Sequence, residues 1–224
     1  MTANPRIFER RGSRGWVILA GESPSVRGSE TSALDSIKHL KESDRALVVL
    51  APKGEIPSSA QSFMSDFEAL IRGGLKIFDP LEMTPALIRK TCQEAQLVLA
   101  MGGNREDWVA VFAEKRLPVN PDLIIAEKTV FVAIGSLVSL LGEWIYDPDH
   151  DQISDGIGWF PKAIFLLGPE APGSKSAVRQ KIETQLKSYA LNLAPDTIIA
   201  VGLQGKVEIW SEAAPEILLG QGWV

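Results

Sequence analysis

The chain has 224 residues, of which 45% are hydrophobic and 23% are charged, and its formal net charge is −5. This composition suits a single α/β domain over residues 1–224, and basic residues interspersed with acidic ones argue against a nucleic-acid partner. No apolar run reaches the roughly 20 residues of a membrane span, and residues 1–6 lack the apolar stretch of a secretory signal, so we expect a cytoplasmic protein without membrane contact.

The single cysteine, Cys92, excludes an internal disulfide and cannot by itself form a cysteine-cluster metal site. We interpret it as a small buried apolar residue. Four arginines lie close together near the N-terminus, but an acidic residue interrupts them. We predict that residues 1–14 form a flexible, solvated arm, and assign these arginines no function.

Short apolar runs alternate along the chain with segments of helical periodicity. The runs predict buried strands at residues 16–20, 46–50, 75–78, 97–101, 129–134, 163–167 and 197–201. The segments between them predict helices at residues 31–41, 59–72, 84–94, 105–115, 137–146 and 174–191. This alternation predicts an α/β fold, a three-layer sandwich with a mostly parallel central sheet.

Local signals refine several elements. Thr84 before Pro85 indicates a helix N-cap, and the last helix carries an apolar stripe through Val178, Ile182, Leu186 and Tyr189. Runs at residues 206–210 and 216–219 predict an antiparallel ribbon at the sheet edge, and the polar residues 147–155 predict a long exposed loop.

Ligands of parallel sheets bind beyond the carboxyl ends of the strands, and two turns there are distinctive. The first is Gly102-Gly103-Asn104, which can aim backbone N–H groups into a cleft as an oxyanion hole or anion site. A simple tight turn is the alternative, because Glu106 and Asp107 already complement the helix dipole and would repel an anion.

The second turn follows the strand at residues 129–134 and leads into a helix. A nucleophile elbow would lie here, because such an elbow places its serine on a strained turn between small residues. In order and spacing, the glycine turn, the elbow region and Leu141-Gly142-Glu143-Trp144 resemble the peptidase E and cyanophycinase family of serine peptidases. The closing residues 220–224 also resemble the end of that family's sequences. The resemblance implies a class I glutamine amidotransferase-like, flavodoxin-like fold.

In that family the elbow strand reads roughly "vvaGsSAGAmvlGew" and carries the nucleophile. Alignment on Gly142 without a gap places Gly135 at the nucleophile, Ser136 at the following alanine and Leu137 at the second glycine. The nucleophile is therefore missing. Neither a shift to Ser136 nor a shift to Ser139 gives flanking residues small enough for an elbow.

A serine nucleophile also needs a general base, usually histidine. The family's histidine follows the strand after the elbow helix, but residues 163–169 contain none. We expect His39 to be solvated at a charged helix end and His150 to lie in a surface loop. The acidic pair of the family's "GiDE" turn is also missing, because residues 202–205 read Gly-Leu-Gln-Gly.

Two further features carry less weight. The acidic residues of the 147–155 loop offer oxygen ligands of the kind that calcium takes, but their spacing is not that of an EF-hand, and we prefer a solvated turn. Trp144 and Trp159 could wall a cleft, but core packing is the default for large aromatic residues. We expect neither a metal ion nor a cofactor.

Three hypotheses for function remain. The first is a catalytically degenerate binding or regulatory protein, monomeric or homodimeric, whose cleft holds a small molecule or a peptide end at Gly102, Gly103, Asn104, Gly135 and Ser136. The second is an active hydrolase of acidic peptides that uses Ser136 with His150 or Glu143 as base. The third is a purely structural subunit whose cleft is filled by side chains such as Leu137.

Overall fold

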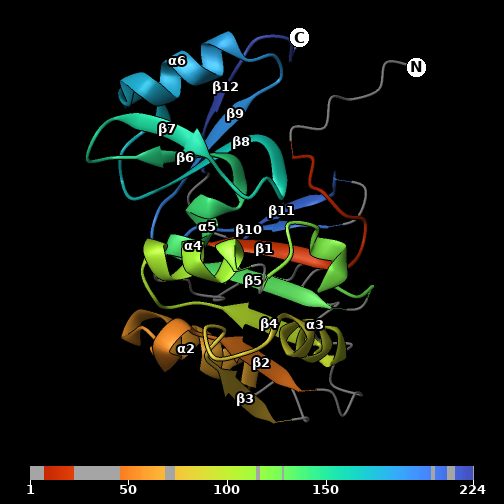
Figure 1. The fold of residues 1–224 in the computed structure, drawn as a ribbon. Coiled ribbons are helices and arrows are strands. Elements are labelled where there is room, and N and C mark those ends of the chain that lie inside the picture. Colours follow the sequence, from red (N-terminus) through yellow and green to blue (C-terminus); the bar gives the residue numbers. More distant parts are fainter. Residues whose placement is uncertain are drawn as a thin grey trace.

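The computed structural model describes residues 8–22, 46–68, 74–114, 117–127, 129–202, 205–210 and 215–223. The helix predicted at residues 31–41, with His39, lies outside these residues. Within them, the chain forms two sheets with helices packed on them (Figure 1). None of the described helices is long and apolar enough to cross a membrane.

The first sheet has the order β11-β10-β1-β5-β4-β2-β3 in the described part of the chain. Its strands are β1 (Trp16–Ala20), β2 (Leu47–Leu50), β3 (Leu75–Phe78), β4 (Leu97–Ala100), β5 (Val130–Ile134), β10 (Ile198–Val201) and β11 (Val207–Ile209). The strands β3, β2, β4, β5 and β1 pair in parallel, and β10 and β11 continue the sheet with antiparallel pairing. All the predicted strands except residues 163–167 are thus confirmed in this sheet. The expected burial of residues 75–78 is wrong, because β3 lies at the sheet edge and its Lys76 and Ile77 are exposed.

Helices cover both faces of this sheet because its strands are apolar at almost every position. Alternate residues such as Val17 and Ile18 belong to two different buried clusters, one on each face. Helix α2 (Ser58–Glu68) packs on one face, and α3 (Pro85–Glu94) and α4 (Arg105–Ala113) pack on the other. Thr84 caps α3 as predicted, with its hydroxyl accepting from the Leu87 N–H.

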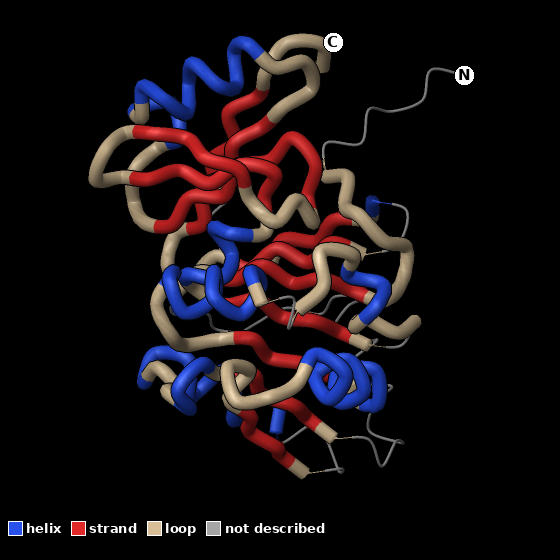
Figure 2. Tube along the Cα trace, in the orientation of Figure 1, coloured by secondary structure: helices blue, strands red, loops and turns tan. Residues whose placement is uncertain are grey.

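A second sheet, which the sequence did not predict, has the order β12-β9-β8-β6-β7. Its strands are β6 (Gly142–Asp147), β7 (Gln152–Asp155), β8 (Phe160–Leu167), β9 (Tyr189–Leu193) and β12 (Glu216–Leu219), and the strand predicted at 163–167 is part of β8. Figure 2 shows these strands grouped apart from those of the first sheet, with helix α6 (Ser176–Thr184) on their outer side. Helix α5 (Ser136–Leu140) contacts both sheets.

The second sheet corrects four predictions. The helix predicted at 137–146 ends at Leu140 and continues as β6, where a Cβ on Gly142 would lie 2.6 Å from the Ala163 carbonyl oxygen. The helix predicted at 174–191 ends at Thr184, and Tyr189 belongs to β9. Residues 147–155 form the β6–β7 hairpin, and β11 and β12 pair in different sheets instead of with each other.

Residues 8–14, expected to be part of a flexible arm, pack against the rest of the protein. The Phe8 ring lies 5.3 Å from the Tyr189 ring in an edge-on arrangement, and the Arg11 N–H donates to the Trp159 carbonyl oxygen. Asp122 accepts from the backbone N–H groups of Ser13 and Arg14. Ring packing and backbone hydrogen bonds therefore hold this segment in place.

Candidate functional site

The glycine turn follows β4 and is held tightly. Gly102 and Gly103 have φ angles of 71° and 62°, in the left-handed region that favours glycine. A Cβ on Gly102 would lie 1.9 Å from the Glu55 carbonyl oxygen, and one on Gly103 would lie 2.9 Å from Pro52 Cβ. Both the backbone conformation and the close approach of residues 52–57 therefore require glycine here.

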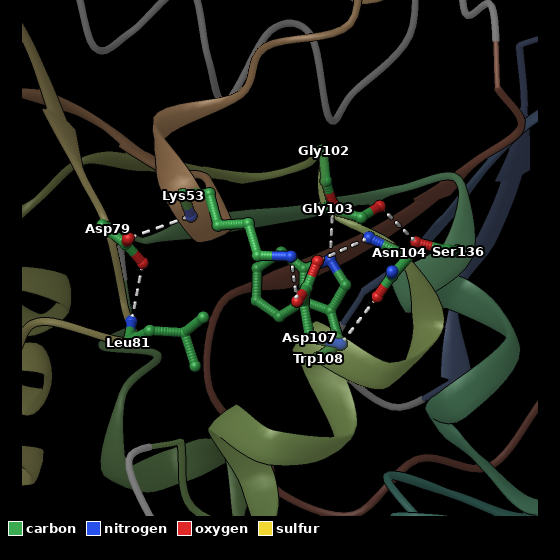
Figure 3. A network of polar contacts seen from close by, with 9 residues as sticks. All are labelled: Lys53, Asp79, Leu81, Gly102, Gly103, Asn104, Asp107, Trp108 and Ser136. Carbon is green, nitrogen blue, oxygen red and sulfur yellow. Dashed lines mark hydrogen bonds and ion pairs between the residues drawn. The ribbon is translucent and has the colours of Figure 1, made fainter.

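Asn104 caps α4 in a reciprocal arrangement (Figure 3). Its side-chain oxygen accepts from the Asp107 N–H at 2.8 Å, and the Asp107 carboxylate accepts from the Asn104 N–H at 3.1 Å. The Trp108 indole N–H donates to the Gly102 carbonyl oxygen at 2.7 Å. These bonds fix the turn to the helix, as a capping box does.

A lysine completes this network. The Lys53 ammonium lies 2.9 Å from the Asp107 carboxylate, and this hydrogen bond raises the pKa of Lys53 and lowers that of Asp107. A pocket of about 450 Å³ lies between residues 53–57 and the glycine turn. An internal carboxylate therefore already occupies the N-terminus of α4, which agrees with the simple-turn alternative for this segment.

The strand–turn–helix predicted for the elbow is present. Gly135 links β5 to α5 with φ 65° and ψ −134°, a conformation that L-residues rarely adopt. The nearest atom to a Cβ placed there would be Glu22 Cγ, at 3.9 Å. Among the described residues no neighbouring atom excludes a side chain at Gly135, and it is the backbone conformation that disfavours one.

Ser136 joins the elbow to the glycine turn. Its hydroxyl donates to the Gly103 carbonyl oxygen at 3.2 Å, and the side chain is half-buried (Figure 3). The Ser139 hydroxyl in turn donates to the Ser136 carbonyl oxygen at 2.8 Å. The structure thus brings Gly102, Gly103, Asn104, Gly135 and Ser136 to one end of the first sheet, but it does not place them in one cleft. Gly102, Gly103 and Asn104 line the pocket beside Lys53, whereas Ser136 lines a separate cleft.

The candidate bases are engaged elsewhere. His150 lies in the exposed turn of the β6–β7 hairpin, where its Nδ1 is 2.8 Å from an Asp147 carboxylate oxygen. This hydrogen bond raises the pKa of His150 and lowers that of Asp147. The Glu143 carboxylate accepts from the Lys162 N–H at 2.7 Å. In the described part of the chain, neither residue is bonded to the Ser136 hydroxyl.

Ser136 and His150 nevertheless line the same cleft, which has a volume of about 960 Å³. Its walls come from α4, α5, the β6–β7 hairpin, the end of β8 and the segment that follows β8. Trp144 and Trp159 do not line it: Trp159 packs edge-on against Phe131 in the core, and the Trp144 ring lies under the Lys181 ammonium. Sequence reasoning missed this cleft because half of it belongs to the second sheet.

The remaining candidates have ordinary surroundings. Asp151 accepts from the Ser176 hydroxyl and the Ala177 N–H, and so ties the hairpin to the start of α6. Within the described ranges, no group of three or more metal-ligating side chains occurs. Gln204 and Gly205 align with the family's acidic pair. Gln204 lies outside the described residues, Gly205 has a φ angle of 71°, and the Gly202 N–H donates to the Lys206 carbonyl oxygen.

These features define a mixed α/β protein whose cleft lies beside a glycine turn and a strand–turn–helix elbow. Comparison of the sequence with protein-family models and with curated proteins gives no match. The fold is similar to that of a peptidase E family protein from Listeria monocytogenes EGD-e, with a TM-score of 0.54 and 12% sequence identity. That similarity covers 88% of this chain and 98% of that chain.

A peptidase from an acI-B1 Actinobacterium is also structurally similar, with a TM-score of 0.47 and 11% identity over 95% of this chain and 97% of that chain. The Listeria structure establishes a peptidase E-like fold for this chain.

Proposed function

We propose that this protein is a catalytically degenerate relative of the peptidase E and cyanophycinase family, on a class I glutamine amidotransferase-like scaffold. Its function would be to bind a small molecule or a peptide end in the cleft, in a regulatory role. The observation that carries the proposal is Gly135, which keeps the backbone conformation of an elbow and offers no side chain for nucleophilic attack.

The arrangement around Ser136 supports the same conclusion. A serine becomes a nucleophile when a base accepts its proton, but the Ser136 hydroxyl donates that proton to the Gly103 carbonyl oxygen. His150 is paired with Asp147, and Glu143 bonds a backbone N–H in the second sheet. A cleft of about 960 Å³ remains available to a ligand.

A fluorophosphonate probe tests the proposal. We expect no covalent labelling of the native protein under conditions that label a control serine protease completely. Stoichiometric labelling of Ser136, found by mass spectrometry and lost in Ser136→Ala, would overturn it.

The active-hydrolase alternative rests on Ser136 and His150 lining one cleft. It predicts turnover of acidic dipeptides or β-aspartyl peptides that Ser136→Ala abolishes. The structural-subunit alternative expected side chains to fill the cleft, but Leu137 is buried in the core and does not line it.

A further inference from the structure

The floor of the cleft is apolar. Val109 and Ala110 of α4 face it from the first half of the protein, and the end of β8, from Phe165 to Leu167, faces it from the second half. Phe165 and Leu166 are buried, whereas 46% of Val109 is exposed. A ligand with an apolar body would cover this floor and release the water over it.

The charged groups of the cleft do not balance. Among the described residues, four carboxylates line it, from Glu106, Asp147, Asp149 and Glu170. Arg105 and Lys175 supply two permanent positive charges, and His150 supplies a third when it is protonated. Lys175 pairs with Glu170, and the positive charge of Arg105 acts on Asp147, which also bonds His150. Within the described residues, the Glu106 and Asp149 carboxylates have no salt-bridge partner.

An excess of carboxylates beside an apolar floor favours a ligand that is apolar and positively charged. A carboxylate ligand would meet a net negative charge, because the four carboxylates outnumber the cations even when His150 is protonated, and a protonated amine would offset that charge. We propose that the cleft binds molecules that join an apolar body to a protonated amine, and disfavours acidic ones. This inference rests on the proposed function as a binding cleft, and it excludes the acidic peptides of the hydrolase alternative.

Three small probes that share a phenyl group test the inference: 2-phenylethylamine, 2-phenylethanol and 3-phenylpropanoate, which are cationic, neutral and anionic at neutral pH. Titration calorimetry or NMR at low ionic strength would give their dissociation constants. We expect the amine to bind at least about fivefold more tightly than the carboxylate, with the alcohol between them. The difference should shrink when salt is added, because the charges are exposed.

Charge-removing variants test whether the preference for the amine arises from the carboxylates of the cleft. Glu106→Gln with Asp149→Asn should reduce the amine's advantage to about twofold or less. A matched double variant, Glu127→Gln with Glu183→Gln, changes the net charge equally at positions outside the cleft and should leave the advantage unchanged.

The outcomes separate this inference from the proposed function. Equal binding of the three probes, or a preference for 3-phenylpropanoate, would overturn this inference and leave the proposed binding function intact. Failure of all three to bind would also overturn this inference, whereas the proposed function would still allow a ligand of another chemical class. Covalent labelling by the fluorophosphonate would contradict only the proposed lack of catalysis.

Discussion

The Ser136 hydroxyl and the Gly103 carbonyl oxygen, 33 residues apart in sequence, are joined by a hydrogen bond of 3.2 Å. This bond links the turn that would carry a nucleophile to the turn that would carry an oxyanion hole. A hydroxyl held in this way stabilises the cleft wall, and its proton points to a carbonyl oxygen, which is not a general base.

Ser136→Ala should therefore act on stability. We expect it to lower the free energy of unfolding by about 1 kcal/mol, because a half-buried hydrogen bond is lost and the Gly103 carbonyl keeps no side-chain donor. Urea denaturation followed by tryptophan fluorescence would measure the change. Ser139→Ala is the control: it also removes one hydroxyl hydrogen bond to a carbonyl oxygen, of 2.8 Å, but that bond lies within α5 and does not link the two turns. If Ser136→Ala were as stable as the wild-type protein, the hydrogen bond between the Ser136 hydroxyl and the Gly103 carbonyl oxygen would be contradicted.

The glycines of the two turns should respond differently to alanine. Gly135→Ala meets no atom of the described residues closer than 3.9 Å, so we expect only the cost of an unfavourable backbone conformation, about 1–3 kcal/mol. Gly102→Ala adds a Cβ 1.9 Å from the Glu55 carbonyl oxygen, and should cost more than about 3 kcal/mol or prevent folding.

Gly74→Ala serves as a control for these variants. Gly74 has φ 78°, and a Cβ added there would meet nothing within 4 Å, so its substitution should resemble Gly135→Ala. Equal losses of stability for Gly102→Ala and Gly135→Ala in urea denaturation would show that residues 52–57 do not approach the glycine turn as described.

The His150–Asp147 pair predicts a pH dependence. The bond to Asp147 raises the pKa of His150 above its ordinary value of 6.5, and an NMR titration of the imidazole should show this. Because the folded-state pKa is raised, the pair stabilises the protein fully below pH 6.5, and this stabilisation is lost as the pH rises through the folded-state pKa.

Asp147→Asn should return the pKa of His150 towards its ordinary value, and should destabilise the protein more at about pH 5.5 than at about pH 8.5. The effect will be small and salt-sensitive because the pair is exposed. In a His150→Gln background the extra cost at the lower pH should vanish. An unchanged His150 titration in Asp147→Asn would show that the two residues are not paired.

Cys92 should be chemically inert in the folded protein. Burial raises the pKa of its thiol to about 12, and the side chain has no exposed surface. We expect no reaction with Ellman's reagent in mildly alkaline buffer, and complete reaction of one thiol per chain in concentrated urea. Rapid reaction in buffer would show that the face of α3 on the sheet opens readily.

The sequence predicted the first sheet well because its strands are apolar on both faces and short, a pattern that residues such as Val98 and Leu99 display locally. It missed the second sheet for two reasons. The elbow helix runs into β6 with only Gly142 and Glu143 between its last leucine and the apolar residues of the strand. The helical stripe of α6 continues by chance into Tyr189, which pairs with Ala163 in β8. Only contacts with distant segments separate helix from strand there.

For the site, sequence order was enough to place the glycine turn and the elbow, since both follow predicted strands. The residues that the side chains of these turns contact could not be predicted from sequence order. Ser136 with Gly103 and Lys53 with Asp107 are contacts between segments that only the folded sheet brings together. The cleft and its uncompensated carboxylates depend equally on the unpredicted hairpin.

One buried cluster runs without interruption from Val17 and Phe131 in the first sheet to Phe165 and Tyr189 in the second. Separating the two sheets would expose all of these side chains to water at once. The free-energy cost of that exposure opposes a hinge motion between the sheets. A ligand must therefore fit the existing shape of the cleft. We expect its binding to be fast and to follow single-step kinetics, without a preceding conformational change.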